Sequence, residues 1–167
     1  CVNAAVSDSP GLLRLHDTDP DVPNNFGGVE LGMLQGAAAG APVPQVVLDE
    51  FLAIDRLKLV KIDIEGMEEA ALRGARRLLD RFKPVLYVEN AYVDRSPALV
   101  NLLHGMGFRL FWHLPVYVTP DNYRGSAERP YPVAFVDRGG PHLDGIGFAI
   151  NLVCVHASLD VVINGLR

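Results

Sequence analysis

The clearest hydrophobic pattern of the chain lies between residues 57 and 89, where two short apolar runs flank an amphipathic segment. Residues 57–64 and 85–88 are rich in aliphatic side chains, as buried strands are. Between them, apolar residues recur at three- and four-residue spacing and arginines take other positions, which predicts a helix with one buried face. The recurring residues are Leu72, Ala75, Leu79 and Phe82, with Pro84 ending the helix. The pattern therefore predicts a β-α-β crossover with two parallel strands.

Shorter elements are expected on both sides of this unit. A second helix fits residues 97–106, with Ser96 as its N-cap and Pro97 at its first position. Strands are expected at residues 2–6, 45–48, 108–112 and 148–155. Turns or loops are expected at residues 7–11, 17–28 and 36–42. The long connection at 114–147, rich in Pro and Gly, is typical of a functional lid.

Composition restricts the class of protein and of partner. The 167 residues are 49% hydrophobic and 21% charged, which suits a single globular domain. A net charge of -5 disfavours a nucleic-acid partner. The cysteines, Cys1 and Cys154, are expected to be buried, reduced thiols, which favours the cytoplasm. Apolar runs fall far short of the roughly 20 residues that span a bilayer, and the sequence indicates no oligomeric state.

Charged residues enter the first predicted strand at alternate positions. Lys61, Asp63 and Glu65 would share one face of an extended segment. A central parallel strand is buried on both faces, so such charges are costly unless the strand ends at a ligand cleft on the carboxyl edge of the sheet. Gly66 permits a tight turn and a close ligand approach there. The alternative is that Lys61 and Asp63 only pair with each other while Glu65 caps the following helix.

Further polar residues follow the neighbouring strands. Glu89 and Asn90 end the second strand and should open onto the same edge. Close carboxylates raise one another's pKa, which suits a general base, or they hold a divalent cation. Alternatively, Glu89 only accepts backbone hydrogen bonds. His113, after the run 108–112, is a candidate base for a substrate hydroxyl, or an ordinary loop histidine.

Several common motifs are absent from the chain. No GxGxxG, P-loop or GxSxG motif occurs, so nucleotide hydrolysis and serine-hydrolase chemistry lose support. The other histidines show no metal-ligand spacing with each other or with the cysteines, so no residue is assigned as a metal ligand.

One family resemblance covers nearly the whole chain. Its core is Lys-Ile-Asp-Ile-Glu-Gly-Met-Glu at 61–68, with Leu72, Gly74 and Ala75, followed by Pro-Val-Leu-Tyr-Val-Glu at 84–89. This block resembles the signature of the FkbM methyltransferases. Residues 3–8 with Gly11, and residues 46–49, 107–113 and 151–155, are similar to other parts of that family.

The resemblance implies a class I methyltransferase fold, a Rossmann-like α/β three-layer sandwich. Its sheet would be mostly parallel, with an antiparallel C-terminal strand. Residues 1–167 would form one truncated catalytic domain from strand three onward, with the glycine-rich cofactor turn upstream of Cys1. The isolated chain is therefore expected to bind cofactor weakly and to be inactive.

The resemblance also implies chemistry. The cofactor would be S-adenosyl-L-methionine, contacted by Ser7, Asp8, Lys61, Asp63 and Gly66. The acceptor would be a hydroxyl of a sugar, glycolipid or secondary metabolite. Its proton would be removed by Asp63 or Glu65, with Glu89 and His113 as weaker candidates on the acceptor side. A magnesium ion bridging the carboxylates and the acceptor is compatible with the sequence but not required.

Two other hypotheses remain open from the residues alone. The chain is a catalytically incompetent binding or interaction module, or it is an α/β enzyme that uses another nucleotide cofactor, such as a nicotinamide.

Overall fold

The computed structural model of the chain describes residues 1–15, 21, 41–114, 125 and 150–161. Expectations for nearly all of residues 17–28, for most of the segments 36–42 and 114–147, and for the start of the strand at 148–155 lie outside these residues. The described helices are α1 (Leu48–Phe51), α2 (Glu68–Gly74), α3 (Arg76–Phe82) and α4 (Ser96–Gly105). The described strands are β1 (Ala5–Val6), β2 (Gly11–Leu15), β3 (Ala41–Val46), β4 (Leu59–Ile62), β5 (Val85–Glu89), β6 (Phe108–His113) and β7 (Asn151–His156).

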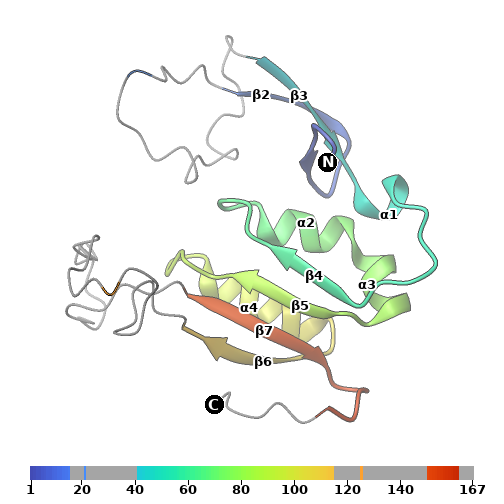
Figure 1. Cartoon of the computed structure of the whole chain (residues 1–167), viewed down its shortest axis with the longest axis vertical. Helices are drawn as coiled ribbons and strands as arrows, with labels where there is room; N and C mark the ends of the chain where they lie inside the picture. Colours follow the sequence, from blue (N-terminus) through green and yellow to red (C-terminus); the bar gives the residue numbers. More distant parts are fainter. Residues whose placement is uncertain (16–20, 22–40, 115–124, 126–149, 162–167) are drawn as a thin grey trace.

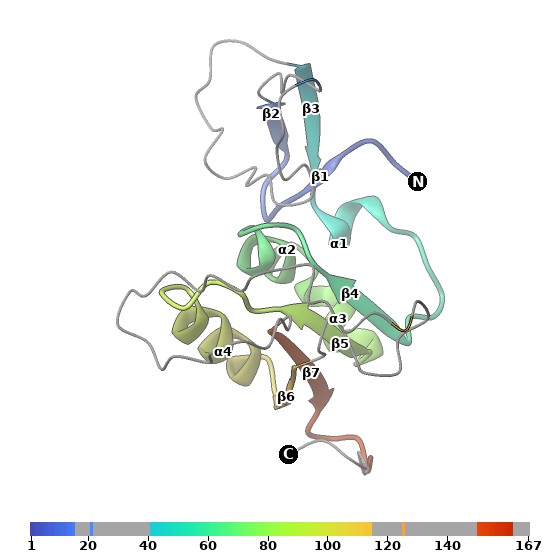
Figure 2. The same cartoon turned by 60° about the vertical axis from the view of Figure 1, so that its left-hand side comes forward.

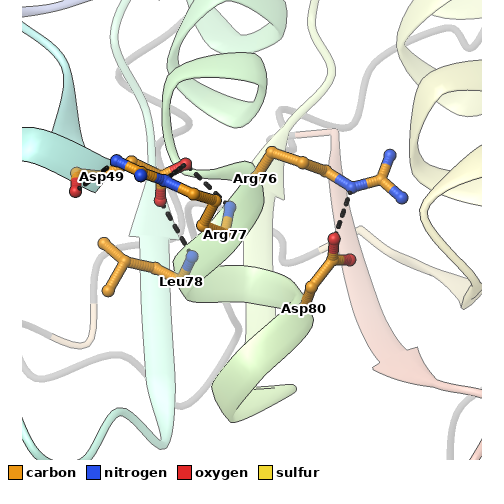
Figure 3. Close-up of polar contacts among 5 residues, drawn as sticks. All are labelled: Asp49, Arg76, Arg77, Leu78 and Asp80. Carbon is orange, nitrogen blue, oxygen red and sulfur yellow. Dashed lines mark hydrogen bonds and ion pairs between the residues drawn. The ribbon is translucent and has the colours of Figure 1, made fainter.

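The predicted crossover is present, but its helix is divided in two. Strands β4 and β5 are parallel neighbours, and α2 and α3 connect them, with a break at Ala75. The break has a tertiary cause, because the carboxylate of Asp49 accepts the backbone N–H groups of Arg77 and Leu78 at 2.7 and 2.8 Å (Figure 3). In an unbroken helix these groups would bond carbonyls four residues earlier. Asp49 therefore caps α3 from a distant part of the chain.

The C-terminal elements form a four-stranded sheet in the order β4-β5-β7-β6 (Figure 1). Strand β7 is antiparallel to both its neighbours, as the family resemblance implies. The expected central position of the first strand is not seen within the described residues, where β4 lies at the edge of this sheet and Leu59 is 61% exposed. Ser96 is also not the N-cap of α4, since it is the first helical residue and its hydroxyl accepts a hydrogen bond from Asn90.

One apolar cluster joins the helices to one face of this sheet. Leu86 and Val88 of β5 are fully buried in it together with Leu72 of α2, Leu79 of α3 and Leu103 of α4. Since alternate strand residues point to opposite faces, the described helices cover a single face. The expected three-layer arrangement is therefore not seen within the described residues.

A second, three-stranded sheet has the order β1-β3-β2. Strand β3 is parallel to β1 and antiparallel to β2. Both sheets are mixed, so the expectation of one mostly parallel sheet is wrong for the described residues. The sequence missed β2 and the start of β3, where Pro42 and Pro44 argue against a central strand. Pairing with a sequence-distant partner decides this strand instead.

Helix α2 lies between the two sheets (Figures 1 and 2). A Cβ on Gly74 would lie 2.1 Å from the carbonyl oxygen of Ser7, so only glycine permits this approach. Met67 at the start of α2 packs with Leu13 and Val43 in a second small core. The short distance at Gly74 therefore sets how closely the three-stranded sheet sits on the helix.

The two cysteines lie in different environments. Cys154 is buried, which raises the pKa of its thiol to about 12, whereas Cys1 is exposed and the expectation of two buried thiols is wrong for it. Every helix of the described ranges is too short or too polar to cross a bilayer. The assignment of the chain to one domain stays a prediction.

Candidate active site

The turn after β4 positions two of the expected acidic residues. The strand ends at Ile62, and the backbone reverses through Glu65 and Gly66, which have φ angles of 49° and 90°. The buried carboxylate of Glu68 accepts the N–H groups of Ile64 and Gly66 at 3.3 and 3.1 Å. Left-handed backbone favours glycine, so Gly66 suits this turn. The first turn of α2 thus fixes the loop that carries Asp63 and Glu65.

Three carboxylates from two neighbouring strand ends converge at this edge. One oxygen each of Asp63, Glu65 and Glu89 lies within 4.8 Å of the others. Lys61 forms an ion pair with Asp63, as the alternative interpretation expected, but solvent reaches both side chains, so the pair contributes little stability. This hydrogen bond raises the pKa of Lys61. Glu65 does not cap the following helix: it accepts a hydrogen bond of 3.0 Å from the hydroxyl of Tyr92.

Glu89 is the carboxylate with the most perturbed electrostatics. Its Oε2 atom is buried and has no hydrogen-bond partner among the described residues. Burial, together with the nearby charges of Asp63, Glu65 and Glu68, raises the pKa of Glu89 to about 7. The alternative in which Glu89 merely accepts backbone hydrogen bonds has no support at this oxygen. A carboxylate with this pKa can exchange a proton near neutral pH.

A polar row extends from Glu89 across the sheet. The strand register places Glu89 beside Asn151 and Asn151 beside His113, so their side chains share the face opposite the helices. Tyr87, two residues before Glu89, belongs to the same face, and its hydroxyl oxygen lies 2.8 Å from Nδ1 of His113. The structure therefore places His113 on the same face as Glu89. Its hydrogen-bond partner there is Tyr87, which sequence analysis had not selected as a candidate residue.

A small cavity adjoins the carboxylates. It is lined by Gly66, Glu68, Glu89, Asn90 and Tyr92, among others, and has a volume of about 20 Å³. A cavity of this size holds about one water molecule. It can therefore accept a single oxygen or ion beside Glu89, but not a whole acceptor molecule.

The five expected cofactor residues are not all brought together. Lys61, Asp63 and Gly66 lie at the end of β4 with the carboxylates. Ser7 is 4% exposed, and its carbonyl packs against Gly74 of α2. Asp8 is exposed and is not a member of the carboxylate cluster. Of the five, Ser7 is the least able to reach a ligand with its side chain.

The same carboxylates could hold a divalent cation. Hard cations such as Mg²⁺ prefer oxygen ligands, and Asp63, Glu65 and Glu89 each offer one within 4.8 Å of the others. The unpartnered Oε2 of Glu89 fits such a role. Sequence analysis considered a divalent cation at these carboxylates but did not require one, and it assigned no residue as a metal ligand.

Three residues of the site were missed from the sequence. Tyr87 could have been found, because it stands two residues before Glu89 in a strand and so must share its face. Glu68 entered the sequence analysis only as the last residue of the signature block at 61–68. Tyr92 offered no local signal, since its contact with Glu65 depends on the folding of the loop after β5.

Comparison with known proteins adds one finding. No curated protein and no solved structure matches the chain. The family model described as the Methyltransferase FkbM domain matches residues 3–110, which include β4, the following turn and Glu89. Two of the three converging carboxylates lie in the signature block at 61–68 and the third ends the adjoining strand. The chain belongs to the FkbM methyltransferase domain family.

Proposed function

We propose that the protein transfers a methyl group from S-adenosylmethionine to a hydroxyl of a sugar, glycolipid or secondary metabolite. Family membership supports methyl transfer, and the carboxylate cluster supports an acceptor that must lose a proton. The observation that carries the proposal is Glu89, a carboxylate with a pKa of about 7 and an unpartnered oxygen at the carboxyl edge of the sheet. The free thiol of Cys154 is compatible with action in the reducing cytoplasm.

Glu89 is the proposed general base. Methyl transfer is an in-line displacement, so the acceptor oxygen must be aligned with the methyl group and give up its proton as the new bond forms. The unpartnered Oε2 of Glu89 can receive this proton, and its pKa near neutrality suits that task. Asp63 and Glu65 are proposed to tune Glu89 through their negative charges rather than to act as bases themselves.

The cofactor supplies the electrophilic methyl group, and residues of this chain would hold it. Lys61, Asp63 and Gly66 are proposed to contact it at the end of β4, with Asp8 as a further contact and Ser7 contributing through its backbone. Lys61 and Asp63 have side chains that are 60% and 38% exposed, so they are accessible to a ligand. The open backbone at Gly66 permits a close approach.

Calorimetric titration of the full-length protein tests the class of cofactor. We expect heat with S-adenosylhomocysteine and none with NAD. Heat with NAD alone would favour a nicotinamide enzyme. The absence of heat with both ligands would favour a binding or interaction module.

Methyl transfer itself is tested with S-adenosyl-[methyl-¹⁴C]methionine and a panel of methyl glycosides, glycolipids and phenols. Glu89→Gln should lower the rate by about 100- to 10,000-fold, as expected for loss of a general base. The matched control is Glu50→Gln, an exposed glutamate on α1, which should retain the full rate. Repeating the assay with EDTA shows whether a divalent cation is required. An undiminished rate in Glu89→Gln would remove Glu89 as the base.

A further inference from the structure

The side chain of His113 is held by Tyr87 on the face of the candidate site. Tyr87 Oη and His113 Nδ1 are 2.8 Å apart, and the two rings meet edge to face with centroids separated by 5.6 Å. Tyr87 belongs to β5 and His113 to β6, and β7 runs between these strands. A contact across two strand spacings, supported by both a hydrogen bond and a ring contact, restricts the orientation of the imidazole.

The hydrogen bond also restricts where the imidazole carries its proton. A neutral imidazole has one protonated nitrogen and one acceptor nitrogen, and the bond made by one of them selects the tautomer. A phenol O–H is a stronger donor than a neutral imidazole N–H, and an imidazole nitrogen is a stronger acceptor than a phenol oxygen. These relative strengths favour donation from Tyr87 to Nδ1, which leaves the ring proton of a neutral His113 on Nε2.

We propose that Tyr87 is a positioning residue that keeps His113 in the Nε2–H tautomer, so that His113 donates a hydrogen bond to an oxygen of the acceptor. The inference rests on the proposed function and deepens it, because it divides the roles of two residues. His113 orients the acceptor through one of its oxygens, and removal of the proton from the reacting oxygen falls to Glu89. Within the described ranges Nε2 of His113 contacts no hydrogen-bond partner, and the side chain is partly exposed, so this N–H is accessible to a ligand.

Nitrogen-15 NMR of the histidine rings tests the tautomer in the unmodified protein. His104 is the internal reference, because its Nδ1 bonds the carbonyl of Phe108 and must therefore carry a proton when the ring is neutral. We expect the opposite pattern for His113, with an unprotonated Nδ1 and a protonated Nε2 in the neutral ring. Loss of the signals in His113→Gln assigns them. A protonated Nδ1 on neutral His113 would overturn the proposal.

Tyr87→Phe tests the cause of that tautomer. It keeps the ring but removes the hydroxyl, so His113 should change to a mixture of tautomers while the signals of His104 and His156 stay unchanged. An unaltered His113 spectrum in this variant would show that Tyr87 does not select the tautomer.

The methylation rates of two His113 variants distinguish a hydrogen-bond donor from a general base at this position. Using the acceptor that takes the label in the panel above, His113→Gln, which retains an N–H donor, should keep the rate within about tenfold, roughly the effect of one perturbed hydrogen bond. His113→Leu, which has no donor, should lose at least about tenfold more. Equal losses in both variants, as large as in Glu89→Gln, would make His113 the base and refute the division of roles. If no acceptor takes the label, the proposed function fails, whereas the NMR result still decides the tautomer.

Discussion

The two faces of β5 differ in chemistry although they belong to one five-residue strand. Leu86 and Val88 have no exposed surface and pack against the helices. Tyr87 and Glu89 alternate with them and lie on the other face, where they are only partly buried and interact with His113 and the carboxylates. The comparison teaches that the helix-covered face demands apolar shape, while the opposite face, against which no described helix packs, carries polar groups. The candidate chemistry therefore belongs to the second face.

The largest effect on stability should come from the helix-covered face. Leu86→Ala removes a fully buried side chain from the main core, so it should lower the free energy of unfolding by about 2–5 kcal/mol. Tyr87→Phe, one residue away, removes only a hydroxyl and should cost no more than about 1.5 kcal/mol. Urea denaturation of both variants measures the difference. Equal losses would show that the two faces contribute alike to the fold.

The next largest effect on stability is expected at the contact between α2 and the three-stranded sheet, on the other side of the helix layer. Gly74→Ala would place a Cβ 2.1 Å from the carbonyl of Ser7, and the resulting backbone shift should cost about 1–3 kcal/mol. Gly105→Ala is the matched control, because its Cβ would meet no atom within 4 Å. This control should be neutral or stabilising by up to about 1 kcal/mol. If both variants unfold at the same urea concentration, the close approach at Gly74 does not matter.

Removing the cap on α3 tests how much a polar residue contributes to the stability of the helix layer. Asp49→Ala leaves the N–H groups of Arg77 and Leu78 without their acceptor and should cost about 0.5–2 kcal/mol. Asp49→Asn keeps one acceptor oxygen and should cost less. Thermal unfolding ranks the variants, and a more stable Asp49→Ala protein would contradict this role.

The smallest effect should be the pH dependence that Glu89 imposes from the polar face. Its folded-state pKa of about 7 lies above the ordinary value of 4.5, so between these pH values the folded protein retains a proton that the unfolded chain releases. Stability should therefore fall as pH rises through this range, by about 1 kcal/mol after allowance for solvent screening. Glu89→Gln should remove this slope and Glu50→Gln should not. An unchanged slope in Glu89→Gln would assign the pH dependence to other groups.

Much of the four-stranded sheet could be predicted from local sequence. The strands at 85–88 and 108–112 and the helix at 97–106 were placed within a few residues, because each has a local hydrophobic period and clear end signals. Asp63, Glu65 and Glu89 were selected as candidate residues, and the structure brings them together. Their convergence follows from parallel strands that end at one edge.

Other features could not be predicted, because they depend on residues far apart in the chain. The helix break at Ala75 arises from Asp49, and strand β2 forms only by pairing with residues 41–45. The edge position of β4 reflects the strand order of the described sheet, which no local pattern contains.

The sequence by itself determined the β-α-β unit and the family. Both can be recognised within one contiguous segment, the unit from its hydrophobic periodicity and the family from the signature block at 61–68. The tertiary structure alone decided that Glu89 has a pKa of about 7 and that His113 forms a hydrogen bond with Tyr87. Burial and nearby charges set the first property, and strand order sets the second. Both arise only when separate segments of the chain come within a few ångströms of each other.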